Sequence, residues 1–155
     1  MTTPAVELLL RYYELGNAAS AEIDADERIR SDIRAAVARG EAPAMQAMLD
    51  MVDEAAEFTA SETRDTVFRG HAGQLQLFQQ WLDVMSDWRV DAEDFAEGPG
   101  GLMLTARVHA RGRGSGIAFE DRAYCVARFD RGKVVAFHEF ETPQAAREAA
   151  GLDPA

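Results

Sequence analysis

Two short glycine-containing turns divide the C-terminal half of the chain into three consecutive segments with the composition of β-strands. The segments are Leu102–Ala110, Ile117–Phe129 and Lys133–Phe140, and the turns are Arg111–Gly116 and Asp130–Gly132. Branched and aromatic residues alternate with polar ones, as in strands with one buried face. Glycine supplies the positive φ angle that tight hairpins require. Strands joined by such short turns are antiparallel, which excludes a doubly wound parallel sheet.

The N-terminal part of the chain is predicted to form a layer of three amphipathic helices. The first begins at Pro4 after a hydroxyl cap and ends at Gly16–Asn17. The second is capped by Ser20 and ends at Gly40. The third opens at Pro43 and has apolar residues at helical spacing, namely Met45, Met48, Leu49 and Val52.

The middle of the chain is predicted to contain a strand, a helix and a further strand. Ala55–Ala60 is the first strand, and Trp88–Phe95 is the second, which the glycine-rich turn Gly98–Gly101 connects to the three-strand segment. A last short helix runs from Pro143 to Ala150. The long helix between the two strands has one apolar face, formed by Leu75, Phe78, Leu82 and Met85. This order predicts an α+β protein in which a curved antiparallel or mixed sheet wraps over helices and leaves a cleft.

Length and charge limit the class of protein. With 155 residues, residues 1–155 are expected to form a single domain. The net charge of −11, from 16 basic and 27 acidic side chains, would repel nucleic acid and anionic lipid surfaces. No apolar run approaches the ~20 residues of a membrane span, and the N-terminus does not resemble a signal peptide. The single cysteine, Cys125, fits a reducing compartment, so we expect a cytoplasmic protein.

Several segments resemble the nuclear transport factor 2-like superfamily, specifically its SnoaL-like branch. The similarity covers roughly residues 40 to 152 and depends on the order and spacing of hairpin and capping patterns. The segments that carry it are Val67–His71, Val90–Glu97, Ala106–Gly116, Arg128–Phe140 and Gln144–Leu152. The resemblance implies a cone-shaped α+β barrel with a deep apolar pocket, in a homodimer formed through the outer sheet face. Relatives include ketosteroid isomerase, polyketide cyclases and limonene-epoxide hydrolase, and some members are not enzymes.

Within this superfamily, Leu104–His109 and Phe137–Phe140 are most similar to the epoxide hydrolase pattern. That pattern has an arginine and an aspartate two residues apart on one strand and an aspartate on the last strand. Arg107 matches the arginine, whereas His109 and Glu139 occupy the positions of the aspartates. The general base of the isomerase would fall near Ala60, which cannot transfer a proton, so we do not expect steroid isomerisation.

The residue pattern itself also selects Arg107, His109 and Glu139 as catalytic candidates. Arg107 and His109 are two residues apart and share a strand face. If that face and Glu139 point into the cleft, a guanidinium, an imidazole and a carboxylate meet in an apolar cavity. His109 would then act as a base that Glu139 or Arg107 orients. The alternative is a buried Arg107–Glu139 ion pair that joins two strands, with His109 as a hydrogen-bonded core residue.

Four further residues are candidates for substrate binding, and each has a simpler structural interpretation. Tyr13 and Trp81 belong to the helical layer and Phe137 to the last strand, so all three are candidates either to line a ligand or to fill the core. Cys125 lies between apolar neighbours, which favours a small buried hydrophobe over a reactive thiol. No metal site is expected, because no two of His71, His109 and His138 have the spacing of zinc ligands on one face.

These observations lead to two hypotheses for the function. The first is a cofactor-independent acid–base enzyme of the isomerase, cyclase or hydrolase type, acting on a small apolar organic molecule. The second is a ligand-binding or dimeric interaction module of the same fold without catalysis, which the loss of both expected aspartates favours. A cavity that is too small for a ligand, or filled by aromatic side chains, would support the second hypothesis.

Overall fold

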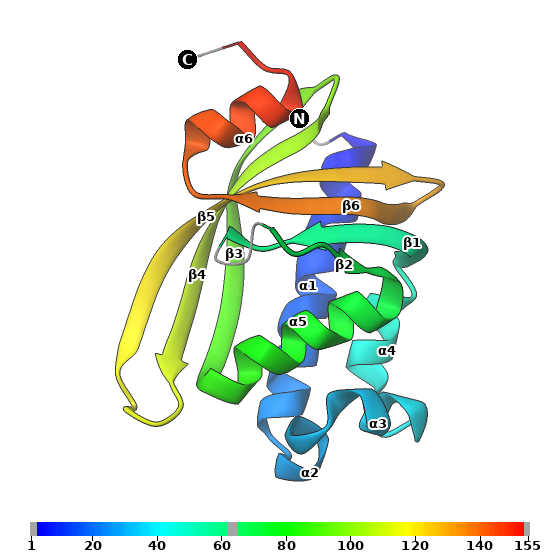
Figure 1. Ribbon diagram of the computed structural model, residues 1–155, viewed down its shortest axis with the longest axis vertical. Coiled ribbons are helices and arrows are strands. Elements are labelled where there is room, and N and C mark those ends of the chain that lie inside the picture. The colour runs from blue at the N-terminus through cyan, green and yellow to red at the C-terminus, as the bar shows by residue number, and fades with distance from the viewer. Residues whose placement is uncertain (1–2, 62–64, 154–155) are drawn as a thin grey trace.

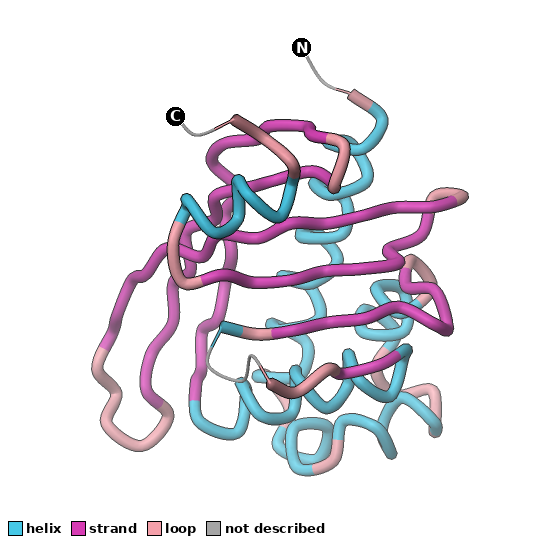
Figure 2. The backbone as a smooth tube through the Cα atoms, turned by 45° about the horizontal axis from the view of Figure 1, so that its top comes forward, coloured by secondary structure: helices cyan, strands magenta, loops and turns pink. Residues whose placement is uncertain are grey.

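The computed structural model describes residues 3–61 and 65–153 and consists of a curved sheet packed on a layer of helices (Figures 1 and 2). The long helices α1 and α5 lie against the inner face of the sheet, and α6 lies on its outer face at one end. The helices are α1 (Pro4–Asp24), α2 (Glu27–Ser31), α3 (Ile33–Ala38), α4 (Pro43–Leu49), α5 (Gly70–Val84) and α6 (Pro143–Ala150). The strands are β1 (Val52–Thr59), β2 (Phe68–Arg69), β3 (Met85–Gly98), β4 (Gly101–Gly112), β5 (Ala118–Asp130) and β6 (Lys133–Phe140).

The six strands form one mixed sheet in the order β2-β1-β6-β5-β4-β3. All neighbouring pairs are antiparallel except β1 and β6, which run parallel. The parallel pair is possible because a long connection, including α5, separates β1 from β6 along the chain. The predicted α+β class with a mixed curved sheet is therefore confirmed. None of the described helices is long and apolar enough to cross a membrane.

The three-strand segment forms as the turn chemistry predicts. Strands β4, β5 and β6 start and end within two residues of the predicted bounds, and β6 matches them fully. In the β5–β6 turn, Arg131 and Gly132 both have positive φ angles, of 53° and 79°. Such a pair is the geometry of a two-residue hairpin turn whose twist matches that of the strands. Helix α6 also has its predicted bounds, with a left-handed Gly151 at its C-terminus.

The first two predicted helix boundaries are wrong. Helix α1 continues through Gly16 and Asn17 to Asp24, and Ser20 lies buried inside it instead of capping a new helix. Gly16 serves packing, because a Cβ atom there would lie 3.1 Å from Met48 Cε. The side chain of Asn17 forms two hydrogen bonds with the backbone of Val90 in β3. Its Nδ2 donates to the Val90 carbonyl and its Oδ1 accepts from the Val90 N–H, each at 2.9 Å. These residues therefore mark contacts with other elements and not a helix end.

Two short helices replace the predicted second helix, and the predicted ends of the third helix and of the long helix are also wrong. Helices α2 and α3 are separate because the side chains of Asp26 and Asp32 each cap a new N-terminus. Val52, assigned from its spacing to the third helix, begins β1, and Met85, assigned to the long helix, begins β3. Both residues are apolar and are the first residues of the strand that follows the helix. Their spacing from the last apolar residues of the helix matches the helical period by coincidence. The strands β1 and β3 are accordingly longer than predicted.

Strand β5 extends well beyond the end of β6, and this difference in length opens the sheet on one side. Strand β4 pairs with β5 from Ala118 to Ala127, whereas β6 pairs with β5 only from Tyr124 to Asp130. Residues 118–123 therefore have β4 on one side and, within the described part of the chain, no strand on the other. The β4–β5 hairpin, with β3 beside β4 along its whole length, forms an arm that extends past β6 (Figure 2).

Arg113, in the turn at the tip of this arm, fastens it to the helical layer. Its Nε donates to the carbonyl of Leu82 at 2.8 Å, and its Nη2 donates to the carbonyl of Met85 at 2.6 Å. The same Nη2 donates to Asp24 Oδ1 at 2.8 Å, at the C-terminus of α1. A guanidinium at the end of α5 satisfies carbonyl groups that the helix leaves without partners. The arm, α5 and α1 are thus held together by one side chain.

We expect the substitution Asp24→Asn to destabilise the fold by about 1.5 kcal/mol near neutral pH, because it removes a partly buried charge-assisted hydrogen bond. Burial raises the pKa of Asp24, but the hydrogen bonds from Arg113 and from the Asp87 N–H, with nearby guanidinium charges, hold that pKa below its ordinary value. The ionised carboxylate therefore stabilises the folded state at pH values above the unfolded pKa of about 4. Urea unfolding at pH 7 and at pH 3 measures this contribution.

The difference between wild type and Asp24→Asn should shrink as the pH falls through the lowered folded pKa, because protonation removes the same charge. The exposed Asp94→Asn on β3 is the matched control, expected to change stability little at either pH. An Asp24→Asn variant as stable as wild type at pH 7 would show that Arg113 does not need this partner.

Candidate functional site

An apolar cavity lies between the helices and the inner face of the sheet. Its volume is about 60 Å³, enough for a few water-sized groups, and its walls come from α1, α4, α5 and strands β1, β3, β4, β5 and β6. Seven of the residues that line it are aromatic, namely Tyr12, Tyr13, Phe58, Phe78, Trp81, Trp88 and Phe137. The four predicted substrate-binding residues, Tyr13, Trp81, Phe137 and Cys125, all lie in this lining. An apolar concave site with few polar groups is the usual form of a small-molecule pocket.

A wider hollow of about 470 Å³ adjoins the cavity at the point where β6 ends. The two share five lining residues: Trp81, Trp88, Val108, Ala123 and Glu139. The hollow also has polar walls, to which Ser61, Asp121 and Arg122 contribute. We call this hollow the mouth of the cavity. It exists because residues 118–123 of β5 have no β6 beside them, so the missing strand leaves an opening.

Glu139 lies at the boundary between the cavity and its mouth, since it lines both. The hydroxyl of Ser61, at the end of β1, donates to Glu139 Oε1 at 2.6 Å. On the sheet, Glu139 is directly opposite Cys125 in β5, so both side chains point to the inner face. A carboxylate at this position reaches the apolar interior and is still connected to the polar mouth.

The two tyrosines of α1 are neutral hydrogen-bonding groups in the cavity wall. Burial, and then the nearby Cys125, raise the pKa of Tyr12 far above its ordinary value. The pKa of Tyr13 is raised mainly by burial, and further by Cys125, Tyr12 and Glu139. Tyr12 is hydrogen-bonded through its hydroxyl to the buried Gln74 of α5. Both phenols therefore stay protonated at any physiological pH and act as donors, not as bases.

Two tryptophans form the wall between the cavity and its mouth. The rings of Trp81 in α5 and Trp88 in β3 stack with centroids 5.2 Å apart and an angle of 30° between their planes. The ring of Phe78 packs against both, with its centroid 6.0 Å from that of Trp81 and 5.8 Å from that of Trp88. The sequence pattern indicates Trp81 as a candidate but not Trp88, which reads only as the start of a strand. Ser61 was also not indicated, because a serine after a strand carries no specific signal.

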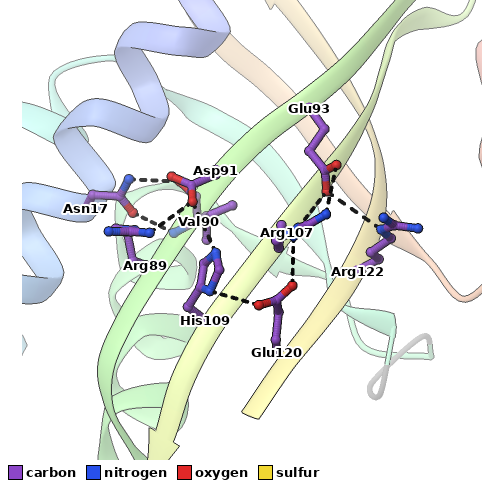
Figure 3. Close-up of polar contacts among 9 residues, drawn as sticks. All are labelled: Asn17, Arg89, Val90, Asp91, Glu93, Arg107, His109, Glu120 and Arg122. Atoms are coloured by element: carbon purple, nitrogen blue, oxygen red, sulfur yellow. Dashed lines mark hydrogen bonds and ion pairs between the residues drawn. The ribbon is translucent and has the colours of Figure 1, made fainter. Parts of the chain in front are cut away.

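The predicted convergence of Arg107, His109 and Glu139 is wrong. Figure 3 shows Arg107 and His109 on the outer face of the sheet, in a network of charged side chains from β3, β4 and β5. Arg107 forms two ion pairs there, with Nε 3.2 Å from Glu93 Oε1 and Nη1 3.0 Å from Glu120 Oε1. The alternative of a buried Arg107–Glu139 ion pair is wrong for the same reason, because these two side chains lie on opposite faces.

The direction of β4 explains this outcome. Val108 lines the cavity, so its neighbours Arg107 and His109 point outward by the alternation of the strand. His109 lies between Asp91, with Nε2–Oδ2 at 3.1 Å, and Glu120, with Nδ1–Oε2 at 3.4 Å. Its ring is neither in the core nor near Glu139. Spacing alone predicts that Arg107 and His109 share a face, which is correct, but not which face this is.

The other two histidines have local structural contacts. His71, in the first turn of α5, contacts the carbonyl of Val52 through Nε2 at 2.7 Å. His138 points to the face opposite Glu139, and its Nδ1 contacts the hydroxyl of Thr59 at 2.8 Å. Burial lowers the pKa of His138, so this imidazole favours the neutral form. Within residues 3–61 and 65–153, no three His, Cys, Asp or Glu side chains gather closely enough to hold a metal ion.

Comparison with solved structures supports the architecture, although similarity in sequence is low. No family model matches the chain, and no curated protein matches it significantly in sequence. An NTF2-like protein of unknown function from Exiguobacterium superposes with a TM-score of 0.63 at 16% identity, covering 87% of this chain and 99% of that one. A protein from Jannaschia described as a SnoaL-like polyketide cyclase gives 0.61 at 13% identity, covering 97% and 94%. TerC, crystallised with polyporic acid, gives 0.61 at 13%, covering 96% and 98%.

The chain has the nuclear transport factor 2-like fold. At these identities the comparison establishes the fold alone, and the predicted resemblance is confirmed at that level. Within this fold the cavity occupies the concave side of the sheet, where the aromatic residues of α1 and α5 gather. The difference in length between β5 and β6 determines where the cavity opens.

We expect Cys125 to be almost unreactive in the folded protein, because it is 1% exposed and burial, with the nearby Glu139, raises the pKa of its thiol. At pH 8, Ellman's reagent should modify it on the order of 100-fold more slowly than in the urea-unfolded chain. As this is the sole cysteine, the absorbance of the released thiolate reports one site. Equal rates in the two states would show that the cavity opens freely to the reagent.

Proposed function

We propose that the protein binds a small, largely apolar organic molecule in the cavity and its mouth, and that Glu139 exchanges protons with it. The observation that supports this proposal is the position of Glu139, a carboxylate on the inner face where the aromatic cavity meets the polar mouth. An acid–base group needs access to the reacting atom of a bound substrate and to a path by which protons reach water. The boundary position provides both.

The proposed chemistry is proton transfer next to a carbonyl or similar group, without a metal or redox cofactor. Glu139, as the carboxylate, removes a proton from carbon, and the electron pair moves onto the carbonyl oxygen of the substrate. The phenol of Tyr13, kept neutral by burial, is the candidate donor to that oxygen. In an isomerisation the protonated Glu139 then returns its proton to a different carbon of the substrate. In a cyclisation the enolate carbon first forms a bond to a second carbonyl carbon of the same molecule, and Glu139 returns its proton to the oxygen of that carbonyl. Ser61, which donates to Glu139, is the positioning residue.

The fold is compatible with such a ligand. TerC, a structure with the same fold, was crystallised with polyporic acid, an organic molecule. The seven aromatic side chains around the present cavity provide flat apolar surfaces of the kind that stack on organic rings. The mouth is large enough for the part of a ligand that the cavity cannot hold.

A non-catalytic binding protein is the second candidate, and the size of the cavity favours it. At about 60 Å³ the inner space is small, and aromatic side chains fill much of the surrounding volume. Arg107 and His109 lie on the outer face, so the described residues that line the inner cavity include one carboxylate, Glu139, and no histidine or arginine. A ligand carrier requires only a cavity that fits its ligand, and it requires no proton transfer.

The enzyme proposal predicts that the protein accelerates exchange of carbon-bound protons. In D₂O, wild-type protein should speed deuterium incorporation next to the carbonyl of small cyclic ketones, followed by ¹H NMR. The substitution Glu139→Gln should reduce the rate of deuterium incorporation by about 100-fold or more, because the amide of glutamine does not act as a base in water near neutral pH. Glu120→Gln, on the outer face, removes the same charge and should leave the rate unchanged.

Saturation transfer from the protein to the ¹H signals of the ketone, without deuterium incorporation, would show binding without proton exchange. This result would support the binding protein over the enzyme. Equal exchange rates for wild type and Glu139→Gln would reject Glu139 as the proton-transfer group. Thermal unfolding of both variants separates a lost reaction from a lost fold.

The homodimer remains a prediction. Its candidate surface is the outer face of β3, β4 and β5, where acidic and basic side chains alternate in the network of Figure 3. A face with both signs of charge is suited to pairing with a second copy of itself. A cytoplasmic location likewise stays an expectation from the sequence.

A further inference from the structure

Strand β5 leaves a row of backbone groups exposed beyond the point where β6 ends. Residues 118–123 pair with β4, and among the described residues no strand lies on their other side. Every residue from Ala118 to Arg122 is exposed, and Figure 1 shows this part of β5 along the outer side of the arm. We call residues 118–123 the free edge of β5.

The hydrogen bonds near the tip of the arm show which backbone groups point away from β4. The carbonyl of Ile117 accepts a hydrogen bond from the N–H of Gly112 at 2.9 Å, so the backbone groups of Ile117 face β4. Backbone groups alternate in direction along a strand of an antiparallel pair. Those of Ala118, Glu120 and Arg122 therefore point to the free edge, where an added strand would meet them.

The opposite edge of the sheet, formed by β3, is covered by α1. The side chain of Asn17 binds the N–H and the carbonyl of Val90, and Asp24 accepts a hydrogen bond from the N–H of Asp87. Side chains of α1 thus occupy backbone groups of β3 that would otherwise be available to another strand. The free edge of β5 is different, because its residues are exposed.

The side chains of the free edge favour a basic partner on the inner face of the sheet. Asp121 lies there opposite Val108, between Phe119 and Ala123 on its own strand. Phe119 is 43% exposed although it is a large apolar residue. The carboxylate of Asp121 accepts a hydrogen bond from the N–H of Arg122 at 2.8 Å, and no cation among the described residues forms an ion pair with it. A cation on a neighbouring strand would complement this charge.

A second copy of the chain is a poor occupant of this edge. A symmetric antiparallel pairing that covers the whole edge is centred on Glu120 or on Asp121, and it places that acid opposite itself. Like charges directly opposite each other destabilise a strand pair. Each copy also has a net charge of −11. An inward-pointing charge such as Asp121 is a known protection of edge strands against their own copies.

We propose that the free edge binds an extended peptide segment of a partner protein, in which a lysine or arginine lies opposite Asp121 between two apolar residues of the same face. Hydrogen bonds to the backbone of β5 provide the attachment, and the basic residue provides the selectivity. The net charge of −11 attracts such a segment. The inference adds an interaction surface and does not depend on the function proposed for the cavity.

Two synthetic peptides test the charge of the partner. They are fluorescein-labelled, C-terminally amidated heptapeptides, Thr-Val-Thr-Lys-Thr-Val-Thr and the same sequence with glutamate in place of lysine. Fluorescence anisotropy should give a dissociation constant at least about tenfold lower for the lysine peptide, because an opposite-charge pair replaces a like-charge pair at Asp121. In NMR spectra, the bound lysine peptide should slow hydrogen exchange of the Ala118 and Glu120 amides. The amide of Phe119, which faces β4, should change little.

Matched variants locate the binding at the free edge. Asp121→Asn keeps an oxygen that accepts from the Arg122 N–H, so it removes only the charge and should reduce the ratio of the two dissociation constants to about threefold or less. Asp94→Asn, the same change on β3, should leave the ratio unchanged. Ala118→Pro removes an N–H of the free edge and should weaken both peptides by about tenfold, whereas Ala118→Val keeps this donor and should bind them as wild type does. Thermal unfolding establishes that each variant folds.

Equal dissociation constants for the two peptides, or equal effects of Asp121→Asn and Asp94→Asn, would overturn the inference, because the selectivity would not come from Asp121. Unchanged exchange of the Ala118 and Glu120 amides with peptide bound would place the peptide elsewhere and also overturn it. A wild-type dimer in sedimentation equilibrium that protects these two amides without peptide would make a second copy the occupant. Absence of binding by both peptides rejects the proposed partner.

Discussion

The pleat of β4, β5 and β6 determines what this protein can do, because it sorts alternate side chains between an apolar hollow and a charged surface. Val108, Ala123, Cys125 and Glu139 point inward, and of these only the last is charged. Their neighbours Arg107, His109, Glu120 and Arg122 point outward, into the polar network that also contains Asp91 and Glu93. A shift of β4 by one residue would reverse this arrangement. The register is therefore the constraint on which both the cavity and the outer network depend.

Most of the fold could be predicted from turn and capping chemistry. The glycines at 132 and 151 need positive φ angles, and the elements beside them lie where the sequence places them. The errors occurred where a residue has a long-range role: Asn17 holds the backbone of Val90, 73 positions away, and so sits inside a helix that its type would end. Local propensity cannot detect such a partner, because the contact exists only after the sheet has formed.

The site could be predicted only in part, for a related reason. Aromatic residues at helical spacing correctly indicated the lining of the cavity, since Tyr13 and Trp81 must pack on the sheet. The inward face of β4 can in fact be read from its alternation, because Leu102, Leu104, Ala106, Val108 and Ala110 form one wholly apolar face and Arg107 and His109 belong to the other. The prediction failed because it asked only which polar residues share a face and not which face is apolar. On the outer face Met103 is buried as well, under helix α6.

The division of side chains between the two faces of the sheet leaves Glu139 as a carboxylate that faces an apolar cavity. A carboxylate that faces aromatic rings is costly unless it is hydrogen-bonded, and Ser61 provides one such bond at the edge of the hollow. At the mouth, where β6 has ended and β5 continues, Glu139 can keep contact with polar surroundings while it faces the interior. Closure of this opening by a longer β6 would make the charge harder to retain. The unequal strand lengths therefore create the entrance for a ligand and also the conditions under which an acidic group is tolerated beside it.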